Sequence, residues 1–261
     1  MDVKEFTFEE VIEKINRSMK PYSLSFKEVL WYSRFSVKES VAENFSVQDR
    51  IFLAGDASHI HSVNGGQGLN TGLGDAFNLI WKLNMILKYG VSANSLFSYE
   101  SERKPVAQSV IETSGELVRS TKYSETRTHA QDYVKLVQKH AGNITGMGIR
   151  YGEQELHGLS GSRLFDLEIY HGTVKTRLYS LLNYTQFTLL IFGECKVDLN
   201  LPEYVKLIQI FPEEFRDGYW TENSPYKNQA VLVRPDSYIE SLTALDQVTP
   251  QARNNIMEQY I

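Results

Sequence analysis

The chain has 261 residues, of which 42% are hydrophobic and 23% charged, and its formal net charge is −5. This length suits one large domain or two smaller ones, and the composition is that of a globular protein. The negative charge argues against a general attraction to nucleic acid or to an anionic membrane surface. Cys195 is the single cysteine, which excludes an internal disulfide and a metal site built from several thiolates.

The sequence shows neither a membrane span nor a secretory signal. The longest apolar run in the C-terminal half, Phe187 to Phe192, is far shorter than the roughly 20 residues that cross a bilayer. Met1 is followed by a polar stretch rather than the apolar core of a signal peptide. We therefore expect a cytoplasmic protein that binds a small molecule, with no membrane span and no nucleic-acid partner.

The N-terminal region is predicted to contain a helix and a strand. Apolar residues recur at helical spacing over residues 8–20, and Pro21 ends this helix. Residues 23–37 are rich in aromatic and β-branched residues and predict a strand. Residues 38–45 indicate a short helix or a turn.

A strand, a glycine-rich loop and a long helix are predicted next. Ile51 to Ala54 predicts a buried strand, which Gly55 interrupts, and the loop runs from Asp56 to Gly68. The helix is predicted from an apolar stripe at a 3.6-residue repeat, and Gly90 stands where a glycine commonly ends a helix. The stripe consists of Leu69, Leu73, Ala76, Phe77, Ile80, Leu83 and Leu87.

The second half of the chain predicts more helices and then a small α/β module. Residues 95–140 are mostly polar with helical patches, and Pro105 lies early in the second of the long helices. Glycines concentrated between 141 and 180 indicate loops and a boundary. A β, α, β series then follows. Its elements are a strand at 178–192, a helix at 201–210 and a short buried strand at 230–233.

The segment from Gly55 to Asn70 has the parts of an anion cradle. Glycines let backbone N–H groups approach a ligand closely, and the N-terminus of a helix carries partial positive charge. Asp56 can accept hydrogen bonds from ligand hydroxyls such as a ribityl chain, or it can cap a turn. Both interpretations of Asp56 stay open at the level of the sequence.

His59 and His61 form an H-x-H pair in this loop. Two ligands on one loop are too few for zinc, and no suitable carboxylate or cysteine cluster lies nearby in the sequence. We therefore expect hydrogen bonds that order the loop, and no metal site.

The block from Arg50 to Leu83 reads RIFLAGDASHIHSVNGGQGLNTGLGDAFNLIWKL. It resembles the flavin-contact block of the FAD-dependent aromatic hydroxylase superfamily, of the para-hydroxybenzoate hydroxylase and phenol 2-monooxygenase type. Further resemblance covers most of the chain. It comprises Tyr99, Glu100, Arg103 and Pro105 after the block, Phe26 to Val37 including Trp31, and Gly161 to Arg163 with Leu232 to Asp236 of the phenol-hydroxylase branch.

The resemblance implies an α/β (α+β) fold class. The chain would be the C-terminal part of a para-hydroxybenzoate-hydroxylase-like fold, followed by a small thioredoxin-like module. It places a partial FAD- and substrate-binding domain at 1–145, a linker region at 146–180, and the thioredoxin-like module, complete or incomplete, at 181–261.

The resemblance also implies a cofactor and a reaction. The carboxylate at Asp56 would bind the ribityl–pyrophosphate region of FAD, and the start of the long helix would approach the flavin ring. The family reduces FAD with NAD(P)H and transfers oxygen from O2 to an activated aromatic ring. The implied cofactor-binding residues are Asp56, Gly65, Gly66, Gln67, Gly68, Leu69 and Asn70, and no catalytic residue is assigned.

Several features depart from the family's pattern. The GxGxxG unit of the Rossmann fold and the middle motif that contacts both FAD and NAD(P)H are absent from this sequence. Val63 stands at a position that is usually proline, while Phe165 and Ser237 replace a common proline and glycine. Cys195 does not form a C-x-x-C pair, so a redox role for the C-terminal module is not expected.

Three functional hypotheses follow. The first is a truncated FAD-dependent monooxygenase that hydroxylates an aromatic or phenolic small molecule. The second is a repurposed, non-redox enzyme that rearranges a hydrophobic substrate by acid/base chemistry, with Asp56, His59 and His61 as candidates. The third is a non-catalytic interaction module, whose apolar face pairs with a second copy or with a partner chain that covers the missing Rossmann half.

Overall fold

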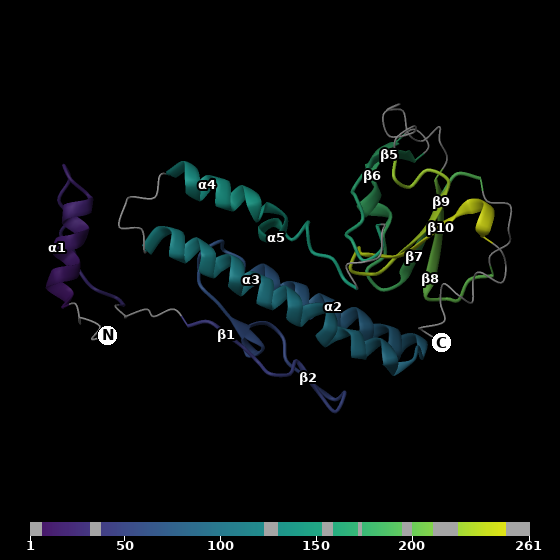
Figure 1. Cartoon of the computed structure of the whole chain (residues 1–261), viewed down its shortest axis with the longest axis horizontal. Coiled ribbons are helices and arrows are strands. Elements are labelled where there is room, and N and C mark those ends of the chain that lie inside the picture. Colours follow the sequence, from purple (N-terminus) through teal and green to yellow (C-terminus); the bar gives the residue numbers. More distant parts are fainter. Residues whose placement is uncertain are drawn as a thin grey trace. The chain divides into compact units, whose positions relative to one another are not determined.

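The computed structural model describes residues 7–31, 38–122, 130–152, 159–171, 174–194, 200–210 and 224–248. The chain divides into two compact units, Met1–Ser36 and Val37–Ile261. Figure 1 shows the helices and strands of both units.

The described part of the first unit is a capped helix and an irregular segment. Helix α1 (Phe8–Ser18) confirms the helix predicted at residues 8–20 and ends two residues earlier than predicted. Thr7 and Glu10 form a capping box at its start. Residues 23–31 contain no strand, so that prediction is wrong there, and 32–37 lie outside the described residues. The backbone of Leu24 instead bonds to the side chain of Asn16.

The second unit begins with two small antiparallel pairs of strands. β1 (Ser40–Val41) pairs with β4 (His59–Ile60), and β2 (Ser46–Val47) pairs with β3 (Ile51–Phe52). The predicted helix or turn at 38–45 therefore contains a short strand.

The strand predicted at 51–54 is shorter than expected and is not buried. Ile51 is 58% exposed because β3 pairs on one side only, within a two-stranded hairpin. The turn of this hairpin includes Gln48 and Asp49 with positive φ angles of 53° and 51°.

Four helices follow along the chain. They are α2 (Gly68–Tyr89), α3 (Ser98–Lys122), α4 (Ala130–Lys139) and α5 (Ala141–Thr145). Gly90 ends α2 in the left-handed conformation with φ of 67°, as predicted. Helices α2 and α3 lie side by side (Figure 1), and polar side chains join them.

Helix α2 presents its apolar stripe to solvent and its polar residues to the interior of the unit. The apolar stripe faces outward, with Leu69, Leu73 and Ile80 more than half exposed. The buried face carries mainly polar residues, among them Asp75 and Lys82. A stripe of apolar residues shows which face of a helix needs a partner, but not whether that partner is present.

The C-terminal module is built on one four-stranded sheet. Its strands are β7 (Phe187–Phe192), β8 (Val205–Ile210), β9 (Gln229–Val233) and β10 (Ile239–Ala244), in the order β10-β9-β7-β8. The β7–β8 pair is parallel, whereas β7–β9 and β9–β10 are antiparallel. This arrangement agrees with a thioredoxin-like sheet. A separate hairpin of β5 (Glu168–His171) and β6 (Val174–Arg177) precedes it.

Two predictions for this module need correction and one is confirmed. The helix predicted at 201–210 is strand β8, because the run Val205–Ile210 completes a parallel ladder with β7. Of the strand predicted at 178–192, only the last part is a strand, namely β7. Its first part, Leu178–Leu181, is a 3-10 helix. The buried strand at 230–233 is confirmed by β9. The division into 1–145, 146–180 and 181–261 stays a prediction.

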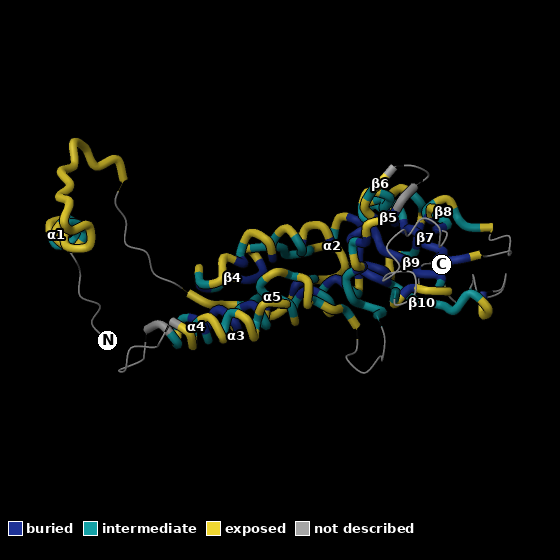
Figure 2. Tube along the Cα trace, turned by 90° about the horizontal axis from the view of Figure 1, so that it is seen from above, coloured by how far each residue is buried: buried dark blue, intermediate teal, exposed yellow. Residues whose placement is uncertain are grey.

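The sheet is buried on both faces. On one face, Trp81 and Met85 of α2 pack with Phe187, and the rings of Trp81 and Phe187 meet edge-on at 5.6 Å. On the other face, residues such as Leu164 and Leu178 cover β7 and β9. Figure 2 shows the buried residues gathered at these strands. Packing of α2 on the sheet therefore fixes this helix relative to the module.

A buried ionic cluster reinforces the contact between the helices and the sheet. Glu102 of α3 accepts two hydrogen bonds of 2.9 Å from the guanidinium of Arg234, which follows β9. Lys82 of α2 lies 3.1 Å from the same carboxylate. Asp236 accepts hydrogen bonds from Arg234 at 2.7 Å and from the indole of Trp81 at 3.0 Å. Three separate segments thus meet in one network of charges.

The cluster shifts the pKa values of its members. Burial raises the pKa of Glu102, but the attraction of Arg234 and Lys82 outweighs it and lowers the pKa to about 2. Burial lowers the pKa of Lys82 to about 8, against the opposing effect of Glu102. Glu102 is therefore ionised at neutral pH and holds two buried cations.

We expect Glu102→Gln to lower the free energy of unfolding at pH 7 by about 3–5 kcal/mol, because it leaves Lys82 buried without its carboxylate and removes one of the two carboxylates that pair with Arg234. A lowered folded pKa gives stability that is present above the unfolded value of 4.5 and is lost as pH falls toward about 2. The difference between wild type and variant should therefore shrink across this window in urea titrations. Glu112→Gln, at an exposed position of α3, is the control, and an equal loss in both variants would contradict the assignment.

Candidate functional site

The loop between β3 and α2 is held close to the helix by a contact between two glycines. Gly55 adopts a left-handed conformation with φ of 59° and starts the 3-10 helix Gly55–Ala57. A Cβ atom added to Gly72 would lie 3.3 Å from the Cα atom of Gly55. Backbone therefore meets backbone here, and side chains at either position would push the loop away from α2.

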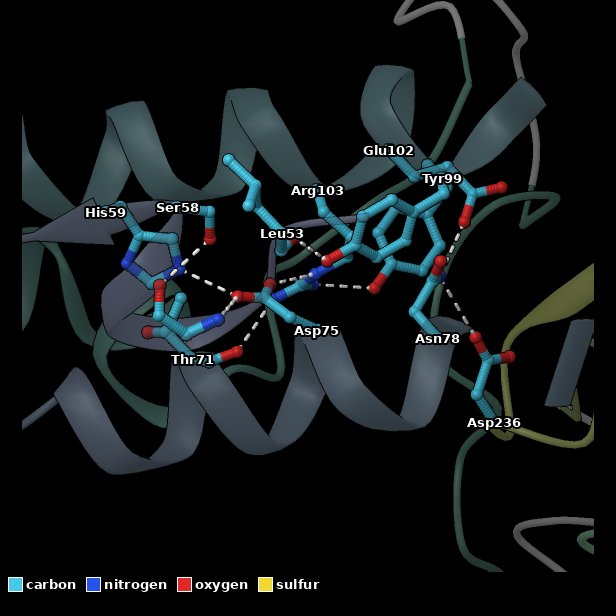
Figure 3. A network of polar contacts seen from close by, with 12 residues as sticks. Leu53, Ser58, His59, Thr71, Asp75, Asn78, Tyr99, Glu102, Arg103 and Asp236 are labelled. Atoms are coloured by element: carbon cyan, nitrogen blue, oxygen red, sulfur yellow. Dashed lines mark hydrogen bonds and ion pairs between the residues drawn. The ribbon is translucent and has the colours of Figure 1, made fainter. Parts of the chain in front are cut away.

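Asp75 of α2 is the centre of the polar network in Figure 3, and it is fully buried. Its carboxylate accepts hydrogen bonds from the Gly55 N–H at 3.0 Å and from the Arg103 Nε–H at 2.7 Å, and it lies 2.7 Å from His59 Nε2. Burial raises the pKa of Asp75, but the bonds from His59 and Arg103 outweigh it and lower the pKa. One carboxylate thus joins the loop, β4 and α3.

Arg103 extends this network toward the C-terminal part of the unit. It donates to the backbone oxygen of Thr71 at 3.2 Å and to the hydroxyl of Tyr151 at 2.8 Å. Burial raises the pKa of the Tyr151 hydroxyl, although Arg103 opposes this shift. Tyr151 therefore remains a neutral partner of the guanidinium at physiological pH.

The two histidines of the loop make the ordering hydrogen bonds that the sequence predicts. His59 contacts Asp75, and His61 Nδ1 lies 2.8 Å from the backbone oxygen of Ser62. The two rings stack with centroids 6.3 Å apart. Among the described residues, no group of three or more His, Cys, Asp or Glu side chains is placed to hold a metal ion.

The predicted cofactor-binding residues lie along one continuous stretch of loop and helix start. Asp56 is exposed, and within the described ranges its carboxylate has no hydrogen-bond or ion-pair partner, so it does not cap a turn. Gly65 and Gly66 have positive φ angles of 89° and 62°. Gly68 is the first residue of α2, and Leu69 and Asn70 are exposed in its first turn.

The N-terminus of α2 is free of a side-chain cap. The first backbone N–H groups of a helix have no partner within the helix, so they are available to a ligand. Gln67 precedes α2 and is only 3% exposed, yet neither polar atom of its amide has a partner in the described part of the chain. Unpaired buried amides of this kind are costly unless a bound group satisfies them.

The residues that order this loop were not singled out as site residues from the sequence. Asp75 and Lys82 lie within an apolar helix pattern, and Asn78 lies between them. Their spacing of three and four residues places them on one face of a helix. In α3, Glu102 supplies the charge opposite to Lys82, and the adjacent Arg103 supplies the charge opposite to Asp75. Such complementary spacing in two neighbouring helices is the signal that could have identified them.

We expect Asp75→Asn to lower the free energy of unfolding by about 3–5 kcal/mol, because Arg103 would remain buried without a counterion. Asp49→Asn, in the exposed hairpin turn, should change stability by less than about 0.5 kcal/mol, since asparagine tolerates the same left-handed backbone. Urea denaturation of both variants checks this. A stable Asp75→Asn protein would show that the carboxylate does not hold the loop.

Comparison with known proteins places this loop in a family. Residues 2–114 match a family described as an FAD binding domain. A flavin-dependent monooxygenase of Mycobacteroides abscessus is 35% identical over 221 residues, which are 83% of this chain and 42% of that protein. A phenol 2-monooxygenase of Aspergillus fumigatus is 34% identical over 151 residues, which are 58% of this chain and 25% of that protein.

The fold also matches solved structures. The anhydrotetracycline hydroxylase OxyS of Streptomyces rimosus has a TM-score of 0.73 and 27% identity, with 98% of this chain and 53% of that chain covered. The chain thus spans about half the length of OxyS and less than half the length of each of the two relatives above. Within the described residues, no helix is long and apolar enough to cross a membrane. The chain belongs to the FAD-dependent aromatic hydroxylase superfamily and corresponds to the C-terminal part of its fold.

Proposed function

We propose that this chain is the C-terminal part of a cytoplasmic FAD-dependent monooxygenase that hydroxylates an aromatic or phenolic small molecule, with NAD(P)H as the reductant. The observation that carries the proposal is the stretch Gly55–Asn70, where Asp75 holds in place the exposed carboxylate of Asp56 and a helix N-terminus without a side-chain cap. The single cysteine, Cys195, also suits a reducing compartment.

The residues present fit FAD. Asp56 is exposed and offers the hydroxyl groups of a ribityl chain a carboxylate that no described residue binds. Gly65 and Gly66 keep the loop before α2 free of side chains, and Gln67 offers an amide without a partner. Bound FAD would supply the electron transfer and oxygen chemistry that no amino-acid side chain provides.

The contribution of this chain to the reaction would be electrostatic. The N-terminal amides of α2, a helix of 22 residues, direct N–H groups and the positive end of the helix dipole toward the loop. Negative charge at that position would be stabilised by donors that are already oriented. The Asp75 network keeps these donors fixed, because it ties the loop to both α2 and α3.

The exposed apolar face of α2 indicates that another protein segment packs against this helix. It forms a continuous stripe that the sheet and α3 do not cover. Exposed apolar surfaces of this kind usually mark interfaces. We propose that a dinucleotide-binding half, like the half of the relatives that this chain does not match, covers the stripe. The exposed residues of this stripe are Leu69, Leu73, Phe77, Ile80 and Leu87.

We expect the purified chain to bind FAD weakly alone and more tightly when it is co-expressed with the N-terminal half of the Mycobacteroides abscessus relative. Asp56→Ala should weaken FAD binding by about tenfold or more, since one charge-assisted hydrogen bond contributes about 1.5–3 kcal/mol. Flavin fluorescence titration measures both effects, with Asp49→Asn as the control. Equal affinity in wild type and Asp56→Ala, or no flavin binding even at high FAD, would refute the proposal.

We also expect the purified chain to self-associate through α2 when no complementary half is present. Ile80→Lys combined with Leu87→Lys should shift it to a monomer without loss of stability, because both side chains are exposed in the folded chain. Val134→Lys, at an exposed position of α4, should leave the association unchanged. Sedimentation velocity provides the measurement, and a wild-type chain that is already monomeric would contradict this expectation.

A further inference from the structure

Two buried networks of charged side chains lie along α2 and α3, and Tyr151 contacts both. In the first network, Arg103 donates a hydrogen bond to Asp75, the carboxylate that holds the loop before α2. In the second, Arg234, which follows β9, pairs with Glu102. Glu102 and Arg103 are neighbours in α3, but their side chains pair with different partners. A residue that contacts both networks can therefore relate the loop to the C-terminal sheet.

Tyr151 uses its hydroxyl for the first network and its ring for the second. The hydroxyl accepts a hydrogen bond of 2.8 Å from Nη1 of Arg103. The guanidinium carbon of Arg234 lies 4.9 Å from the centre of the Tyr151 ring, and the ring of Tyr238 packs on the same tyrosine at 4.3 Å between centroids. A cation near an aromatic ring is attracted to it, and paired rings fix each other's orientation. The direction of the Tyr151 hydroxyl is therefore set by residues beside the C-terminal sheet.

The backbone of Tyr151 is tied to the same sheet. Its N–H donates to the backbone oxygen of Gly161 at 2.9 Å, and the N–H of Gly161 donates to the backbone oxygen of Ile239, the first residue of β10, at 2.8 Å. Gly161 has a positive φ angle of 73°, and a Cβ atom there would collide with the backbone oxygen of Tyr151. Only glycine allows this approach. Both the backbone and the ring of Tyr151 thus belong with the C-terminal module.

Arg103 connects Tyr151 with the loop before α2. The residue is 1% exposed, and its guanidinium donates to Asp75, to the hydroxyl of Tyr151 and to the backbone oxygen of Thr71. A planar guanidinium with donors on several sides is oriented by all of its acceptors together. Loss of the tyrosine hydroxyl would leave a buried donor without this partner and let the plane tilt. The bond to Asp75, which also holds the N–H of Gly55, would then weaken.

We propose that Tyr151 is a positioning residue through which the C-terminal module orders the loop before α2. The sheet holds Tyr151, Tyr151 orients Arg103, and Arg103 orients the Asp75 carboxylate that accepts from Gly55. A chain of packed and hydrogen-bonded groups of this kind can carry energetic coupling between distant segments. That the ordered loop serves FAD rests on the proposed function, whereas the coupling itself involves no flavin.

The test is hydrogen exchange measured by NMR on the isotopically labelled full chain without FAD. It follows the N–H of Gly55 and the Nε–H of Arg103, because both donate to Asp75. Tyr151→Phe keeps the ring and removes only the hydroxyl. We expect both hydrogens to exchange faster by about tenfold or more, the effect of losing one hydrogen bond to a charged group, and the Nε resonance of Arg103 to shift.

Tyr179→Phe is the matched control. Tyr179 is also half-buried, and its hydroxyl donates to the backbone oxygen of Leu164 at 2.6 Å, beside the same sheet. This variant removes a hydroxyl of the same kind from the C-terminal module without touching the bond to Arg103. It should therefore leave the exchange of Gly55 and the resonance of Arg103 as they are in the wild type.

A second variant perturbs the link from the side of the sheet. Tyr238→Leu removes the ring on which Tyr151 packs, so it should also speed the exchange of the Gly55 N–H. In the Tyr151→Phe background the same change should have little further effect, because the hydroxyl that transmits it is already missing. A double-mutant cycle of the four proteins measures this dependence.

The proposal is overturned if Tyr151→Phe leaves both hydrogens unchanged or if Tyr179→Phe speeds their exchange equally. It is also overturned if Tyr238→Leu has the same effect with and without the Tyr151 hydroxyl. A parallel FAD titration should show weaker binding in Tyr151→Phe than in Tyr179→Phe. Absence of FAD binding in the wild type would contradict the proposed function alone, since the exchange rates decide the coupling without FAD.

Discussion

The carboxylate of Asp75 is buried in α2 and is approached by donors from three parts of the chain. A buried charge is tolerated only when it is paired and hydrogen-bonded, so each donor must arrive at a defined position. The Gly55 N–H brings the loop to the helix, His59 brings β4, and Arg103 brings α3. The path of the loop before α2 therefore depends on this one side chain.

A second buried cluster repeats the same principle farther along the two helices. Glu102 and Asp236 neutralise Arg234 and Lys82, and Trp81 links the cluster to the core of the sheet. Helix α2 thus uses its polar face for internal contacts and presents its apolar face outward. This inversion has a simple physical explanation in a fold whose relatives are about twice as long, because the outward face is suited to pack against further protein.

The sequence predicted well those elements whose signals are local. Gly90 ends α2 as expected, because only a left-handed residue closes that helix, and the apolar run at 230–233 is a buried strand. It predicted poorly those elements that depend on distant partners. The run 205–210 became a strand because β7 offers a parallel ladder, and residues 23–31 lack strand structure because the described part of their unit contains no strand that could pair with them.

The candidate site was predictable in part, and for the same reason. Glycines at 65 and 66 and the start of α2 are visible in the sequence, because left-handed turns and helix starts have local signatures. Asp75 and Arg103 were not identified as its supports, because their pairing requires two helices to lie side by side. Whether Asp56 caps a turn was open in the sequence, and in the structure its carboxylate has no described partner.

The central claim is that the stretch Gly55–Asn70 is a flavin site held ready by Asp75. It is tested most directly by NMR titration of the isotopically labelled chain with FAD, which follows each backbone amide separately and detects weak binding. The account predicts that the largest chemical-shift changes occur at the amides of Asp56 and of Gly65 to Asn70. In the Asp75→Asn variant these changes should no longer be concentrated at those amides. Shifts confined to other parts of the chain, or none at saturating FAD, would contradict it.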